Sequence, residues 1–148
     1  PELLHEYQRV LRPGGIVRIT EGDIIAESTS PSLKKLQQLT LDAACNAGNF
    51  FTNESNGVTS QLARLLRRYG FLPIQAQAYL LTSRAGTPQG QRYFENMKLA
   101  FRNIVPYLHK WTQVPADYEQ LYQQALVEMQ QPDFVANWTL LTVLGTNP

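Results

Sequence analysis

The stretch ELLHEYQRVLRPGGIVRITEGD, residues 2–23, decides how the chain folds. Its first half predicts a helix, because apolar residues recur at helical spacing at Leu3, Leu4, Tyr7, Val10 and Leu11. Pro13 and the two glycines after it end this helix, since the residue before a proline is pushed out of the α region and glycine admits a tight turn. The β-branched run over residues 16–21 then predicts a buried strand. Helix, turn and strand together form half of a βαβ unit.

Acidic residues follow directly from this strand, in Glu21-Gly22-Asp23. Open α/β sheets bind their ligands at the carboxyl ends of the strands. Glu21 and Asp23 are therefore candidates to hold a substrate or to act as a catalytic base. Both fit equally well the interpretation of solvated loop carboxylates.

Two helices are expected after the first strand. Ser30 is placed to cap a helix over residues 32–47, with Pro31 at the first helical position, where a missing N–H costs nothing. Thr59 is placed to cap a helix over residues 60–69. Each helix has an apolar face that predicts packing against a core.

The second half of the chain predicts two more strands and a helical insertion between them. Apolar and polar residues alternate over 73–82, and residues 134–145 are dense in β-forming side chains. Residues 88–132 have helical periodicity, which Pro106 kinks or divides. Trp138, in the last strand, fits a core position better than a ligand contact.

Two segments carry a family resemblance. Glu6-Tyr7-Gln8-Arg9-Val10-Leu11-Arg12-Pro13-Gly14-Gly15 resembles the E-x-x-RVLRPGG segment of class I S-adenosylmethionine-dependent methyltransferases, and most closely those of quinone and other small-molecule metabolism. Leu65-Leu66-Arg67-Arg68-Tyr69-Gly70-Phe71 resembles the L-x-x-x-GF segment of the same family. The resemblance implies α/β architecture, the C-terminal part of a Rossmann-like sheet. The three predicted strands would be its fifth to seventh, the last entering antiparallel between the other two.

The same resemblance implies methyl transfer from S-adenosylmethionine to a small-molecule acceptor. Residues 1–148 would form a single partial methyltransferase domain, with 88–132 as a helical lid. In the family the glycine-rich cofactor loop lies well before the RVLRPGG segment, so its counterpart is expected upstream of Pro1. This chain would then be the substrate-side fragment, with no cofactor-binding residues of its own and no activity alone.

Candidate substrate-binding residues lie in the loop after the 32–47 helix and in the insertion. Asn49 and Phe50 fall in that loop, and Tyr107 and Trp111 fall in the proposed lid. Phe50 fits a core position equally well. His109 is a candidate base at neutral pH, although a surface histidine at a helix end is the more ordinary interpretation.

Composition narrows the class of protein. Hydrophobic content of 43% and charged content of 17% are those of a globular chain. A net charge of +1 gives no electrostatic case for nucleic acid or an anionic membrane. No apolar run approaches the roughly 18 residues of a membrane span. The lone Cys45 fits a reducing, cytoplasmic setting, and it has no His or Cys at ligand spacing, so no metal site is predicted.

The sequence leaves one alternative to a methyltransferase open and disfavours two others. A non-catalytic α/β assembly fragment would dimerise through the strand edge of Ile16 to Glu21, because an unpaired edge is a template for association. A Rossmann-type oxidoreductase is disfavoured, because no Tyr-x-x-x-Lys occurs. A serine hydrolase is disfavoured by the absence of Gly-x-Ser-x-Gly.

Overall fold

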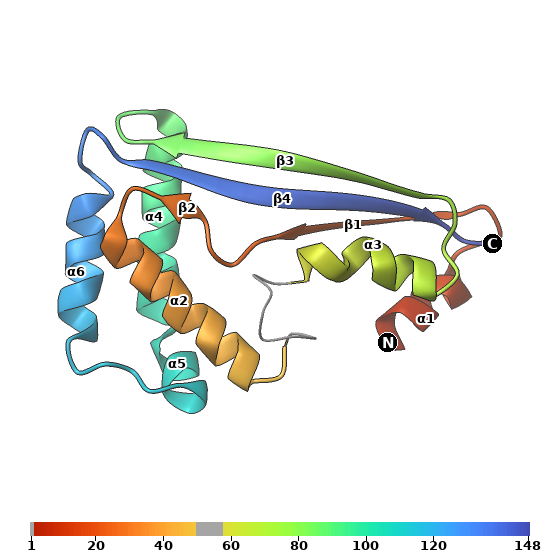
Figure 1. Ribbon diagram of the computed structural model, residues 1–148, viewed down its shortest axis with the longest axis horizontal. Coiled ribbons are helices and arrows are strands. Elements are labelled where there is room, and N and C mark those ends of the chain that lie inside the picture. Colours follow the sequence, from red (N-terminus) through yellow and green to blue (C-terminus); the bar gives the residue numbers. More distant parts are fainter. Residues whose placement is uncertain (1, 50–57) are drawn as a thin grey trace. The chain divides into compact units, whose positions relative to one another are not determined.

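The computed structural model describes residues 2–49 and 58–148 as α/β structure with an open antiparallel sheet of four strands (Figure 1). The described residues divide into two compact units: unit 1 lies within 1–23, 57–79 and 139–148, and unit 2 within 24–56 and 80–138. In chain order the elements are α1 (Glu2–Val10), β1 (Ile16–Gly22), β2 (Glu27–Ser28), α2 (Pro31–Asn46), α3 (Thr59–Arg68), β3 (Ile74–Arg84), α4 (Pro88–Asn103), α5 (Val105–Trp111), α6 (Tyr118–Glu128) and β4 (Val135–Thr146).

The C-terminal strand β4 is the strand to which the other three pair. β1 runs antiparallel to its second half, with Ile16 opposite Thr146, and β2 runs antiparallel to its first half. β3 also pairs with β4, and the Leu72 N–H donates to the Thr146 carbonyl at 2.8 Å. Thr146 thus has β1 on one side and the start of β3 on the other. The prediction that the last strand runs antiparallel between the other two is confirmed.

In unit 1, α1 and α3 pack against one face of the sheet. Their contact is a cluster of buried apolar side chains: Leu4, Val17, Leu62, Leu66, Phe71 and Val143. The prediction of a buried strand over 16–21 is wrong in degree, because Val17 is the only residue of β1 that is fully buried and Ile16 is 63% exposed. The reason is that helices cover only one face of this strand.

The Arg12–Gly15 turn joins α1 to β1 as the sequence predicts. Gly14 has a φ of +73°, a conformation that side chains with a Cβ rarely adopt. A Cβ on Gly15 would lie 2.8 Å from the Arg12 carbonyl oxygen, so no larger residue fits. Asn147 completes the end of α1, since its side-chain amide donates to the Leu11 carbonyl at 2.9 Å. The turn is therefore fixed both by its glycines and by the residue after β4.

Unit 2 is mainly helical. α2 packs against α5 and α6, and the shared core includes Leu33, Leu36, Leu108, Ala125 and Phe134. The predicted Ser30 cap is confirmed, because its hydroxyl accepts from the Leu33 N–H at 3.0 Å. Pro106 divides the insertion as predicted: α4 ends at Asn103 and α5 begins at Val105. The assignment of 88–132 as a lid stays a prediction.

One predicted cap is wrong. Thr59 is already the first residue of α3, Val58 occupies the cap position, and Val58 makes no side-chain bond there. The Thr59 hydroxyl instead donates to Asp23 at 2.6 Å. The sequence pattern predicts a bond between the Thr59 side chain and the helix backbone, but the hydroxyl bonds to the Asp23 carboxylate instead.

Candidate small-molecule site

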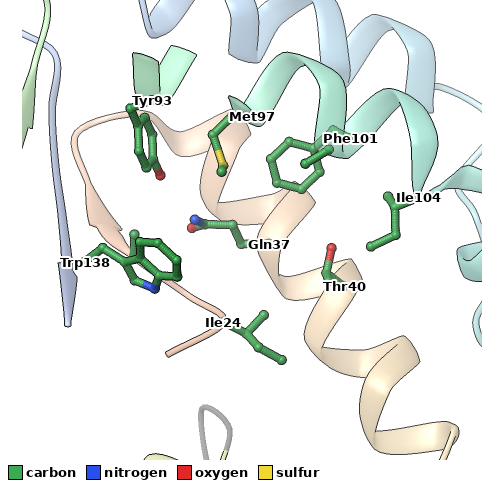
Figure 2. Close-up of a pocket in the computed structure, with 10 residues that line it drawn as sticks. Ile24, Gln37, Thr40, Tyr93, Met97, Phe101, Ile104 and Trp138 are labelled. Carbon is green, nitrogen blue, oxygen red and sulfur yellow. The ribbon is translucent and has the colours of Figure 1, made fainter. Parts of the chain in front are cut away.

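A cavity of about 160 Å³ lies within unit 2, among side chains from α2, α4, β4 and the segment before β2 (Figure 2). Most of its lining is apolar: Ile24, Ala26, Met97, Ala100, Phe101 and Ile104. The remaining lining residues are Gln37, Thr40, Tyr93 and Trp138, none of which is ionised at neutral pH. A concave apolar pocket with a few polar groups is the usual form of a small-molecule site.

Tyr93 is the lining residue with unused hydrogen-bonding capacity. Its hydroxyl oxygen is buried and has no hydrogen-bond partner in the described part of the chain. Figure 2 shows this hydroxyl pointing into the space bounded by Met97, Gln37 and Trp138. Burial raises the pKa of Tyr93 to about 12, and the nearby Gln37 side chain acts in the opposite direction. The O–H therefore keeps its proton at neutral pH.

Gln37 and Thr40 are the two lining residues of α2 that can form hydrogen bonds, and both bond to backbone groups of the protein. The Gln37 amide, oriented to match its surroundings, donates to the Ala26 carbonyl at 3.1 Å and accepts from the Ala26 N–H at 3.3 Å. The Thr40 hydroxyl donates to the Leu36 carbonyl at 3.0 Å, which leaves its oxygen lone pairs free to accept. The cavity thus offers an acceptor at Thr40.

The sequence-predicted lid residues lie elsewhere in unit 2. The Asn49 amide donates to the Tyr107 hydroxyl at 2.9 Å, so the structure brings these two predicted residues together. Trp111 is half-buried at the end of α5, with the Lys110 ammonium 5.1 Å from its ring centroid. His109 is exposed on the same helix. None of these four lines the cavity, and Phe50 lies outside the described residues.

The two carboxylates after the first strand belong to unit 1. Glu21 is exposed and pairs in register with Leu141 of β4. Asp23 is half-buried, and its carboxylate accepts the hydrogen bond from Thr59. Both residues remain candidate bases, as the sequence predicts.

Sequence reasoning missed Gln37, Thr40 and Tyr93 as site residues. A signal was present in the 32–47 helix, because positions 37 and 40 fall on the same face as Leu33 and Leu36. Polar residues on an otherwise buried helix face need an internal partner, and that requirement points to a polar site inside unit 2. Tyr93 gave no such signal, because an aromatic at helical spacing is ordinary core.

Residues 2–49 and 58–148 contain no group of three or more His, Cys, Asp or Glu side chains placed to hold a metal ion. Within the same ranges, no helix combines the length and apolar character that crossing a membrane requires.

Comparison with known proteins adds no relative. No protein-family model matches the sequence, and no curated protein matches it.

Proposed function

We propose that residues 1–148 supply the substrate side of a class I S-adenosylmethionine-dependent methyltransferase that acts on a small molecule. The observation that carries the proposal is the place of β4, antiparallel between β1 and β3. The residues before β1 and β3 are those that resemble the family's E-x-x-RVLRPGG and L-x-x-x-GF segments. Motif and strand order are independent features, and both favour the same family.

The chain's own residues fit an acceptor better than a cofactor. S-adenosylmethionine supplies a methyl group from a sulfonium centre, and its amino-acid part is charged. The cavity in unit 2 has uncharged lining and a volume of about 160 Å³, so it does not fit that molecule. We therefore assign no cofactor contact to the described residues, and a segment outside them would supply the glycine-rich loop.

What the described residues contribute is binding and positioning. An apolar cavity holds an acceptor away from water, and correct placement of two reactants accounts for much of the rate of such a transfer. Glu21, Asp23 and His109 stay the candidate bases predicted from the sequence for an acceptor that must lose a proton. A cytoplasmic location stays a prediction of the sequence.

Calorimetric titration with S-adenosylhomocysteine tests the proposal. The protein extended by its upstream coding sequence is expected to bind at micromolar strength, about −8 kcal/mol. Residues 1–148 alone are expected to show no heat of binding while their circular dichroism spectrum stays that of a folded chain. Absence of binding by the extended protein would overturn the proposal, and so would binding by residues 1–148 alone, because the cofactor site would then lie within them.

The assembly alternative rests on a separate observation. In the described part of the chain β1 pairs with β4 only, so its other edge has no strand partner. We expect self-association through this edge to weaken when Ile16, which is 63% exposed, is changed to lysine, because charge on an edge opposes strand pairing. Light scattering measures the change, and Leu99→Lys, at an exposed position in α4, is the control. A wild-type chain that stays monomeric would contradict this alternative.

A further inference from the structure

We propose that the part of β3 in unit 2 binds an extended, acidic segment of a partner protein. The segment would pair with Leu80–Ser83 as an added strand and place an Asp or Glu side chain on Arg92. The inference concerns a partner surface, so it goes beyond methyl transfer and rests on no part of that proposal.

β3 has an open edge. It pairs with β4 along one side, and no strand of the described part of the chain pairs with its other side (Figure 1). An edge strand presents a row of N–H and C=O groups to which a further strand can pair, and natural edges are protected by short length, by lysine or by proline. β3 has 11 residues, and residues 74–83 contain no proline and no charged side chain. This edge therefore lacks those protections against strand addition.

A groove of about 500 Å³ follows this edge within unit 2. All four residues of Leu80–Ser83 line it. Successive side chains of a strand point to opposite faces, so a groove that four consecutive residues line runs along the edge of the strand and not over one face. Four strand residues span about 13 Å, which sets the least length of the bound segment.

One face of α4 forms the other wall of the groove. The α4 residues that line it recur at helical spacing, which places them on the same side of the helix: Gln89, Arg92, Tyr93 and Asn96. The start of α4 is held at the end of β3, because the Thr87 hydroxyl donates to the Arg84 carbonyl at 2.8 Å. An edge strand beside side-chain pockets suits an added peptide strand, since backbone bonds supply affinity and the pockets supply specificity.

Arg92 sets the charge of the partner. It is exposed, and among the described residues it is the only charged residue that lines the groove. Its guanidinium forms no ion pair within the described part of the chain. A carboxylate is the complementary group, because it accepts two parallel hydrogen bonds from arginine. A second copy that paired through its own β3 would not supply one, since residues 74–84 contain no Asp or Glu.

The leucines of the edge set the other side chains of the partner. Leu80 is 63% exposed and Leu81 is 46% exposed, so both present apolar surface that an added strand would cover. Cross-strand pairs of apolar and β-branched side chains stabilise a sheet. The expected segment is therefore rich in Val, Ile and Thr and carries one Asp or Glu.

Selection from random nine-residue peptides displayed on phage tests the inference with residues 1–148 immobilised. Peptides of the expected composition should be enriched on the wild-type chain and not on Leu80→Lys, because a lysine on an edge opposes strand pairing. Equal enrichment on both proteins, or no enrichment on either, would overturn the proposal. Enriched peptides without an acidic residue would overturn the role of Arg92.

Fluorescence polarisation with the most enriched peptide locates the contact of the acidic residue. Arg92→Glu should weaken binding about tenfold or more, which is the size of a hydrogen bond between charged groups. A peptide with lysine in place of its acidic residue should bind this variant better than it binds wild type. Arg102→Glu, at an exposed position of α4 outside the groove, is the matched control and should bind as wild type does. Equal losses in the two variants would overturn the contact with Arg92.

Methylation of the peptide backbone distinguishes strand addition from other modes of binding. Only alternate N–H groups of an added strand point toward its neighbour. N-methylation of that set should abolish binding, and N-methylation of the other set should leave it close to that of the parent peptide. Equal effects of the two sets would overturn strand pairing.

Light scattering tests whether the edge is occupied by a second copy of the chain. A wild-type chain that dimerises and a Leu80→Lys chain that stays monomeric would overturn the peptide proposal, because the edge would then bind another copy. Leu99→Lys, at an exposed position outside the groove, is the control. None of these experiments uses S-adenosylhomocysteine, so their failure leaves the methyltransferase proposal as it stands.

Discussion

The cores of the two units differ in how they treat polar groups. In unit 1, α1 and α3 pack a cluster of apolar side chains against one face of the sheet, and the buried polar residues Thr142 and Asn147 both have hydrogen-bond partners. In unit 2 the core includes tyrosines whose hydroxyls reach backbone carbonyls, a buried glutamine, and the cavity beside Tyr93. Buried polar groups are tolerated where partners satisfy them, so the one hydroxyl without a partner stands out. Among the described residues, the buried hydroxyl without a partner therefore lies in unit 2, on a residue that lines its cavity.

The largest effect is expected at Gly90, in the first turn of α4 in unit 2. A Cβ at this position would overlap the carbonyl group of Arg84, which is backbone and cannot move aside. Gly90→Ala should therefore cost about 3 kcal/mol or more in the free energy of unfolding, measured with denaturant. Gly86→Ala is the control: its φ is +75° but no atom lies near its Cβ, so about 1–2 kcal/mol is expected. A Gly90→Ala protein as stable as wild type would contradict the described start of α4.

Matched deletions in the two cores come next. Leu66 in unit 1 and Leu36 in unit 2 are both fully buried, and truncation of either to alanine should cost about 3 kcal/mol. Amide hydrogen exchange sharpens the comparison. Leu66→Ala should accelerate exchange most in α1 and α3, and Leu36→Ala should do so most in α2 and α6. A uniform acceleration in both variants would show that the two units open as one.

Glu128 supplies a smaller, pH-dependent contribution to unit 2. Its carboxylate accepts from the Ser30 hydroxyl at 2.6 Å, and from the Ser32 N–H at 3.0 Å and hydroxyl at 2.8 Å, at the start of α2. Burial acts to raise its pKa, but the hydrogen bonds from Ser30, Ser32 and Gln124 outweigh burial and hold the pKa below 4.5. A lowered folded-state pKa means that the stabilisation is present above pH 4.5 and is lost as the pH falls through the folded value.

Glu128→Gln removes this charge and should cost about 1–2 kcal/mol at neutral pH. The difference from wild type should shrink as the pH of the unfolding experiment is lowered below 4.5. Glu119→Gln, an exposed change on the same helix, should stay within about 0.5 kcal/mol of wild type. A Glu128→Gln effect that is independent of pH would contradict the role given to the hydrogen bonds between the Glu128 carboxylate and the start of α2.

The smallest effect separates the tyrosines of unit 2. Tyr118→Phe removes the hydrogen bond to the Phe101 carbonyl and should cost about 1 kcal/mol of unfolding free energy. Tyr93→Phe removes a hydroxyl without a described partner and should be neutral or stabilising by up to about 1 kcal/mol. Thermal unfolding of the two variants measures the difference. Equal losses would show that the Tyr93 hydroxyl is satisfied within the protein.

Local patterns predicted the elements well and their burial less well. Ser30 and Pro31 fixed the start of α2, and the RPGG turn fixed the start of β1, because caps and turns depend on neighbours in sequence. The exposure of β3 could not be predicted from the sequence. Its alternating residues predict a strand, yet the side chains from Gln75 to Thr82 are exposed, since what covers a strand face is decided by distant segments.

The candidate site shows the same division. The sequence directed attention to Asn49 and Tyr107, which do meet, but it gave no means to place Tyr93 beside Gln37. Those two residues lie on different helices, and neither has an unusual neighbour along the chain. Tyr93 differs from Tyr118 and Tyr122 only in the folded structure, where its hydroxyl has no hydrogen-bond partner among the described residues and theirs bond to backbone carbonyls.

The sequence by itself determined the helices, the turn at Gly14, the strands β1, β3 and β4, and the resemblance to a methyltransferase segment, because each depends on residues within a few positions of one another. It did not predict the short strand β2. The tertiary structure decided the pairing of β2 with β4, which carboxylate takes the Thr59 hydroxyl, and where a cavity remains. These outcomes depend on side chains far apart in the chain competing for the same partners and the same space, and no local pattern records the result of that competition.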